Sequence, residues 1–152
     1  MKPKLIILTT LVSNLLLGNL LLFLMHGKYA SLGEKLYVHG LTSIVALVLL
    51  FLLFKKISPS TKKYTLIILP IIFSCLVPLI SVYVMFSLFG LIDGSDARDV
   101  LKGFFVAIPL AIISSMVSWF FWLPFGIMNT GFAHWYRAAL RRLANKTMSS
   151  IQ

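Results

Sequence analysis

Residues 5–27 read LIILTTLVSNLLLGNLLLFLMHG and contain no Asp, Glu, Lys or Arg. A helix rises about 1.5 Å per residue, so roughly 20 such residues cross the hydrocarbon core of a bilayer, which is about 30 Å thick. Three further uncharged stretches follow, at residues 36–54, 64–92 and 103–136. The sequence therefore predicts an all-α integral membrane protein, a bundle of four transmembrane helices.

The composition excludes an ordinary soluble fold. Of the 152 residues, 59% are hydrophobic, and the mean hydropathy is +0.97. Four spans use most of this length, so we expect loops of about ten residues and a single membrane domain over residues 1–152. We expect the first span to be uncleaved, because it is longer than a typical signal core and no small-x-small site closes it. The expected spans are residues 5–25, 38–54, 64–92 and 100–122.

The charged residues lie between these stretches, and the formal net charge is +10. In a four-span model, the net positive charge falls on one side of the membrane and every carboxylate falls on the other. Basic residues accumulate in the cytoplasmic loops of membrane proteins. The pattern therefore predicts a protein of a bacterial inner membrane with both termini in the cytoplasm. The basic clusters are expected to face the anionic lipids of the inner leaflet rather than nucleic acid. The cytoplasmic side would hold Lys2, Lys4, Lys55, Lys56, Lys62, Lys63, Arg137, Arg141, Arg142 and Lys146, and the outer side Glu34, Asp93, Asp96 and Asp99.

Small and polar residues recur every four positions in the first and fourth spans. Residues at i and i+4 share one face of a helix, so each set forms a stripe. In lipid, such stripes mark helix contacts, because small residues allow close backbone approach and an Asn amide needs a partner. The predicted interface residues, facing either this chain or another, are Thr10, Asn14 and Gly18 in the first span and Gly103, Ala107, Ala111 and Ser115 in the fourth.

The third stretch is too long to cross a bilayer upright. Pro70 and Pro78 predict a bend within it, because each removes an intrahelical hydrogen bond. The fourth crossing is expected to end near Trp122, which would lie in an aromatic belt at the cytoplasmic interface. Residues 127–136 are not expected to cross again.

Residues 132–148 have a different pattern, with apolar residues on one helical face and basic residues on the other. A basic amphipathic helix with aromatic residues on its apolar face is typical of a segment that lies flat on an anionic inner leaflet. The alternative is that the fourth span continues into solvent. The residues expected at the membrane surface are Trp135, Tyr136, Arg137, Arg141, Arg142 and Lys146.

The acidic loop before the fourth span holds the weak candidates for a metal site: Asp93, Asp96 and Asp99. Carboxylates suit hard divalent cations. We favour helix capping, with Asp96 as N-cap and Asp99 at N3, because negative charge satisfies the exposed amides at a helix start. We therefore expect no cofactor.

No pattern typical of catalysis is present: the sequence has no HExxH, CxxC or phosphate-binding glycine loop. We expect a small non-enzymatic protein that binds another membrane protein or itself, as an accessory or regulatory subunit. An immunity-type factor is also compatible, since the immunity proteins of pore-forming colicins are similar in size and in having several spans. The alternative is a small transporter or channel with an outward-facing acidic loop, in which Pro70, Pro78 and Pro109 supply bends.

Overall fold

The computed structural model describes residues 2–25, 32–93 and 97–149. These residues form five helices and no strand: α1 (Pro3–Met25), α2 (Leu32–Lys56), α3 (Lys63–Asp93), α4 (Ala97–Val117) and α5 (Trp119–Ser149). Within the described ranges, three helices (α1, α2 and α3) are long and apolar enough to cross a membrane, and α4 and α5 meet that criterion as a pair bent by 70°. The all-helical prediction is confirmed, with three to four candidate spans.

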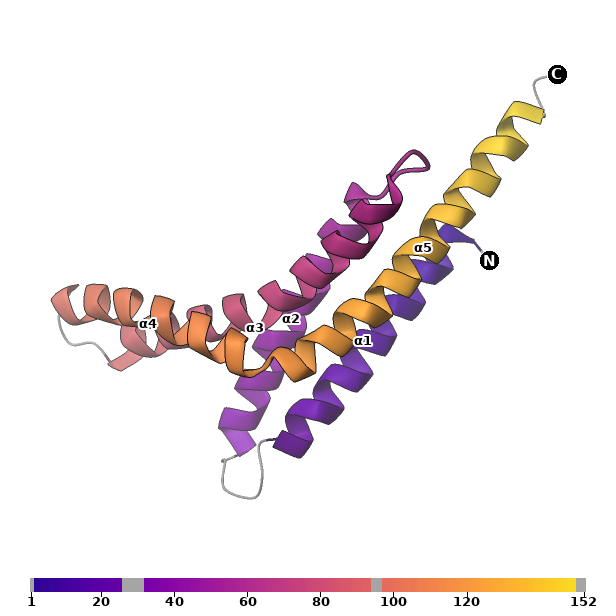
Figure 1. Ribbon diagram of the computed structural model, residues 1–152. Coiled ribbons are helices and arrows are strands. Elements are labelled where there is room, and N and C mark those ends of the chain that lie inside the picture. The colour runs from indigo at the N-terminus through magenta and orange to yellow at the C-terminus, as the bar shows by residue number, and fades with distance from the viewer. Residues whose placement is uncertain (1, 26–31, 94–96, 150–152) are drawn as a thin grey trace.

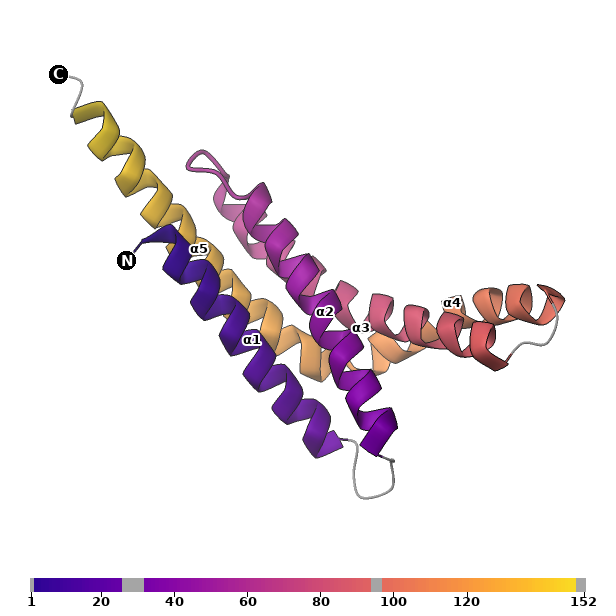
Figure 2. The same cartoon turned by 180° about the vertical axis from the view of Figure 1, so that it is seen from behind.

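The helices are arranged as a bundle with a projecting arm (Figures 1 and 2). The bundle consists of α1, α2, α5 and the first half of α3, and the arm consists of α4 with the second half of α3. Helix α3 changes direction near its middle, so its two halves belong to different parts. Pro70 and Pro78 lie inside it, and the hydrogen bond that each proline removes makes such a bend inexpensive.

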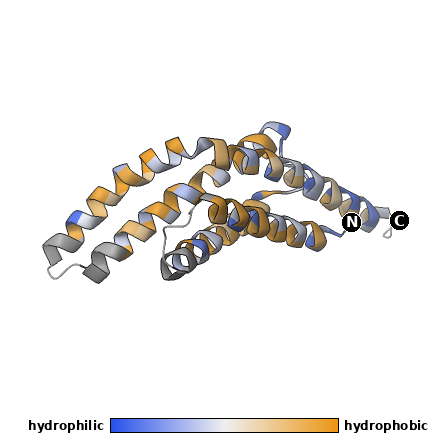
Figure 3. Cartoon of the chain, turned by 90° about the horizontal axis from the view of Figure 1, so that it is seen from below, coloured by the Kyte–Doolittle hydropathy of each residue, from blue (hydrophilic) through white to orange (hydrophobic). Residues whose placement is uncertain are grey.

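Both termini and the turn between α2 and α3 lie at the same end of the bundle (Figure 1), where hydrophilic residues gather (Figure 3). We call this the basic end, because it carries Lys2, Lys4, Lys55, Lys56, Lys62 and Lys63. The main hydrophobic core lies directly beneath it. Its buried members come from α2, α3, α5 and the turn: Leu50, Leu53, Phe54, Ile57, Leu66 and Ala133.

The middle of α5 packs on this core through Phe132, Ala133 and Tyr136, whereas residues 141–149 are mostly exposed. Tyr136 meets Phe54 edge to face, with ring centroids 5.0 Å apart. Arg137 is buried and donates from Nη1 to the Thr61 carbonyl at 2.8 Å, and Arg141 donates from Nε to the Pro59 carbonyl at 2.8 Å. On the apolar face, Ala139 is buried and Tyr136 half-buried, whereas Trp135 and Leu143 are 47% and 49% exposed. The exposed predicted surface residues are Trp135, Arg141, Arg142 and Lys146.

The structure also differs from the single helix predicted over residues 100–122, because the chain bends at Ser118. The Ser118 carbonyl accepts hydrogen bonds from the amides of Phe121 at 2.9 Å and Trp122 at 3.3 Å, which starts α5. The Trp122 indole donates to the Ser115 carbonyl at 2.8 Å, at the end of α4. Trp122 therefore holds the bend together and lies far from the basic end, where a cytoplasmic aromatic belt was expected.

Beyond the bend, α5 packs on α3 and α1 through one face, while Ile127, Gly131 and Trp135 on its other side are exposed. Gly126, Asn129 and Ala133 are buried, so part of residues 127–136 packs against other helices. These three positions share one face of the helix, and two of them are small, so the backbones can approach closely.

Gly126 tests this close approach. A Cβ atom added there would lie 3.1 Å from Ile71 Cα and 3.2 Å from its Cγ1. Gly126→Ala should destabilise the protein by about 1–3 kcal/mol through overpacking. The higher helix propensity of alanine should offset up to about 1 kcal/mol of this loss. The measurement is SDS-induced unfolding in mixed micelles, followed by circular dichroism.

Gly131→Ala is the matched control, because nothing lies within 4 Å of its added Cβ. This variant should be neutral or more stable than the wild type. Equal stability changes for the two variants would contradict the close packing of α5 on α3.

Candidate functional site

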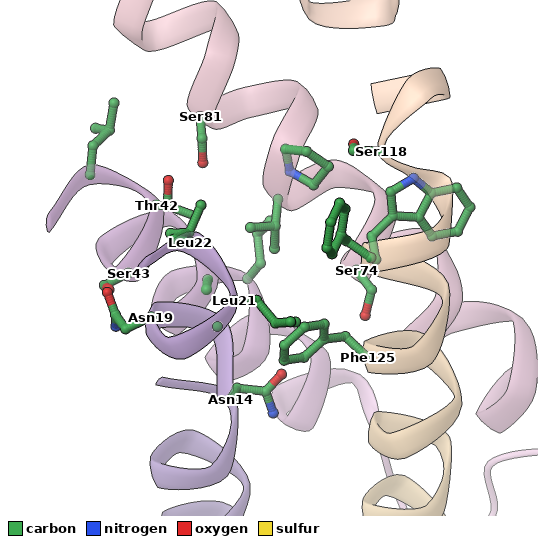
Figure 4. Close-up of a pocket in the computed structure, with 18 of the residues that line it drawn as sticks. Asn14, Asn19, Leu21, Leu22, Thr42, Ser43, Ser74, Ser81, Ser118 and Phe125 are labelled. Atoms are coloured by element: carbon green, nitrogen blue, oxygen red, sulfur yellow. The ribbon is translucent and has the colours of Figure 1, made fainter. Parts of the chain in front are cut away.

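A cavity of about 280 Å³ lies where the arm diverges from the bundle (Figure 4). All five helices contribute to its wall, most of which is apolar. The polar residues that line it are Asn14, Asn19, Thr42, Ser43, Ser74, Ser81, Ser114, Ser118, Trp122 and Asn129. These include no acidic, basic or histidine side chain, so the cavity is suited to a neutral, largely apolar molecule.

Two asparagines pair at the base of the cavity. The Asn14 amide donates to Asn129 Oδ1 at 2.7 Å, and the Asn129 amide donates back to Asn14 Oδ1 at 3.1 Å. Asn129 also donates to Ser74 Oγ at 3.3 Å. This buried cluster joins α1, α5 and α3, and the amide donors of both asparagines point to protein acceptors.

A second polar cluster joins α1 to α2 beside the cavity. The Asn19 amide donates to the Leu15 carbonyl at 2.9 Å and to Ser43 Oγ at 3.0 Å. His39 Nδ1 lies 2.8 Å from Asn19 Oδ1. Because the amide oxygen can only accept, the histidine carries a proton on Nδ1. His39 is thus a structural partner of Asn19 in this cluster.

Ser81 of α3 differs from these residues, because its hydroxyl is buried and has no hydrogen-bond partner among the residues that the structure describes. The residue is 6% exposed. A serine in a helix commonly donates to the carbonyl four residues earlier, as Thr10 does to Ile6 at 2.8 Å. The Ser81 hydroxyl instead points into the cavity (Figure 4). A buried hydroxyl left unpaired costs about 1–3 kcal/mol, so this position is destabilising while the cavity holds nothing that pairs with it.

Except for Gly18, the members of the two predicted stripes lie at contacts between helices of this chain. Thr10 and Asn14 are buried, and Gly18 lines the cavity. On α4, the stripe packs against α3, with Gly103 half-buried. The buried members of that stripe are Ala107, Ala111 and Ser115.

Ser115 adds a polar contact to this interface. Its hydroxyl donates to the Cys75 carbonyl at 3.3 Å and lies 3.5 Å from Cys75 Sγ. The single cysteine is therefore a packing residue between α3 and α4.

The acidic loop is only partly covered by the structure. Asp96 lies outside the described residues, whereas Asp93 ends α3 and Asp99 lies in the first turn of α4. Among the residues that the structure describes, no group of three His, Cys, Asp or Glu side chains could hold a metal ion.

Sequence reasoning missed Asn129 and Trp122 as residues of this site. The missed signal was the spacing of Gly126, Asn129 and Ala133 on one face of a helix, which resembles the small-and-polar stripes of the other spans. The pairing of Trp122 with the end of α4 had no sequence signal, because it depends on the bend at Ser118.

Comparisons with models of protein families, with curated proteins and with solved structures found no match.

The hydrogen bonds between Asn14 and Asn129 should appear as a coupling free energy between substitutions at the two positions. In a double-mutant cycle, Asn14→Leu and Asn129→Leu should each destabilise the protein, because each leaves the other amide without its partner. We expect a coupling of about 0.6–1.7 kcal/mol, as found for hydrogen bonds between membrane helices. SDS-induced unfolding of the two single variants and the double variant gives this value.

Asn145→Leu is the control, since Asn145 is exposed near the end of α5. It should change stability little. Additive effects of the two buried substitutions would contradict the reciprocal hydrogen bonds.

Proposed function

We propose that this chain is a non-enzymatic protein of the bacterial inner membrane that acts by docking to the transmembrane helices of another protein. It would be an accessory subunit or an immunity-type factor. In this proposal α4 and α5 together make a fourth, broken span, and both termini are cytoplasmic.

The outer face of α4 is the observation that carries the docking proposal. One face of α4 holds the small stripe and packs on α3. The opposite face holds Phe105, Ile112 and Met116, which are 66%, 47% and 69% exposed. Spacings of seven and four residues put these large side chains on one stripe. The arm thus offers a continuous apolar ridge at membrane depth, away from the bundle.

A projecting arm favours a protein partner because it has few neighbours of its own. Helix α4 packs against α3 and touches α5 only near the bend. Helices in lipid associate through close van der Waals packing and interhelical hydrogen bonds. A partner helix seated on the ridge of α4 would give the arm the contacts that helices inside the bundle already have.

The basic end supports the proposed orientation. Lysines from α1, α2 and α3 gather there with exposed Arg142 and Lys146 of α5. Each basic residue near an anionic cytoplasmic leaflet contributes about 1 kcal/mol of attraction. This cluster favours keeping both termini and the turn between α2 and α3 on the cytoplasmic side.

Reporter fusions test the orientation. An enzyme that is active only outside the cytoplasm should be active when fused after Ala30 or Ser95, because both positions are predicted to lie in outer loops. The same reporter should be inactive after Ser58 or Gln152. Activity at Ser58 would reverse the proposed topology.

Ridge variants test the docking. Phe105→Ala with Met116→Ala should reduce the share of the protein that migrates in a larger complex after extraction from its native membrane in mild detergent. The matched control is Leu16→Ala with Phe23→Ala on α1, where the two side chains are 68% and 66% exposed. The control should leave the complex intact. Equal loss, or no complex for the wild type, would contradict docking through the arm.

Transport is the competing function, and flux measurements separate it from docking. The purified wild-type protein in liposomes should give no saturable ion or solute flux. A flux that Asp93→Asn or Asp99→Asn abolishes in a folded protein would replace the docking proposal with a conduction path.

A further inference from the structure

We propose that the cavity between bundle and arm binds one acyl chain of a membrane phospholipid, with the ester carbonyl of that chain accepting a hydrogen bond from Ser81. This inference is independent of docking through the outer face of α4, because the cavity lies where the arm meets the bundle and does not include that ridge.

The size of the cavity fits a chain. A cavity of about 150 Å³ in a protein core holds a benzene molecule, so a volume of about 280 Å³ accommodates on the order of ten to twelve non-hydrogen atoms by the same scale. A helix with its side chains is about 10 Å wide and does not fit in this space. A segment of one acyl chain does.

The wall chemistry fits a neutral chain with a single polar group. Most of the wall is apolar, and the asparagines at its base are already paired with protein groups. Ser81 remains, with its buried hydroxyl directed into the cavity and no partner in the described part of the chain. A hydroxyl donates one hydrogen bond, and an ester carbonyl supplies the matching acceptor without a charge.

The depth of Ser81 agrees with this assignment. Along α3, Ser81 lies about 27 Å from Lys63 at the basic end. The hydrocarbon core is about 30 Å thick, and in the proposed orientation this path along the bent helix takes Ser81 away from the cytoplasmic side, toward the ester groups of the opposite leaflet. A lipid of that leaflet could therefore place its ester at Ser81 and its chain in the cavity, toward Asn14 and Asn129.

Trp122 provides a direct readout, because it lines the cavity. In a Trp119→Phe, Trp135→Phe background it is the single tryptophan. The probe is a phospholipid brominated in the first half of its acyl chains, mixed into vesicles of the same unbrominated lipid. Trp122 should be quenched at lower mole fractions of brominated lipid than random contact with surrounding lipid predicts.

Filling the cavity should remove this quenching. Gly18 lines the cavity, and nothing lies within 4 Å of a Cβ atom added there. Gly18→Leu should therefore occupy the space and reduce the quenching of Trp122 by at least about twofold. Gly131→Leu is the control, since its added Cβ is equally free and it does not line the cavity. Equal quenching in these two variants would overturn the proposal.

A second pair of variants tests the hydrogen bond and does not depend on whether Gly18→Leu folds. The probes are a chain-brominated fatty-acid methyl ester and the corresponding brominated hydrocarbon. Ser81→Ala should weaken binding of the ester about two- to tenfold, the range for one hydrogen bond, and leave the hydrocarbon unchanged.

The control for that pair is Ser87→Ala. Ser87 is also buried on α3, and its hydroxyl has no partner within residues 2–25, 32–93 and 97–149, but it does not line the cavity. Ester affinities that are the same in the Ser81 and Ser87 variants would overturn the role of Ser81. Loss of ester and hydrocarbon binding alike in Ser81→Ala would overturn it as well, because a lost hydrogen bond affects only the ester.

Discussion

The close packing of α5 between α1 and α3 is the constraint on which the rest of the structure depends. It combines a steric condition with a polar one. Gly126 brings the backbones of α5 and α3 together, with a hypothetical Cβ only 3.1 Å from Ile71 Cα. Nearby, the side-chain amides of Asn129 and Asn14 donate hydrogen bonds to each other. Water is absent from the hydrocarbon core, so an amide in a span must find a protein partner, and this requirement fixes the register of α5.

The position of α5 determines the direction of the arm. Helix α4 packs through its small residues on the second half of α3, which leaves the bundle after its prolines. The chain must therefore turn between α4 and α5, and it does so over one residue, Ser118, with an angle of 70°. The Trp122 indole covers the end of α4 at this turn, which reduces the cost of interrupting a helix in an apolar environment.

The cavity is a geometric consequence of the same arrangement. At the basic end the helices converge on a core of large side chains, closed by arginine contacts to the turn between α2 and α3. At the other end α3 departs with α4, and no helix of the bundle fills the angle. The buried Ser81 hydroxyl faces this space. A buried hydroxyl is usually paired, and a ligand with an acceptor group in the cavity would pair Ser81.

The sequence by itself determined the helical class, the approximate extent of the first three helices and the contact faces of α1 and α4. These properties follow from local patterns: uncharged length, residues repeated every four positions, and proline placement. It also grouped the lysines at one end. Tertiary structure alone decided the break at Ser118, the packing of α5 on α1 and α3, and the formation of the cavity. Each of these depends on contacts between residues far apart in the chain, such as Asn14 with Asn129 and Arg137 with Thr61. The hydrophobicity of a helix does not reveal such contacts, because it is the same whether the small face of the helix meets lipid or another helix.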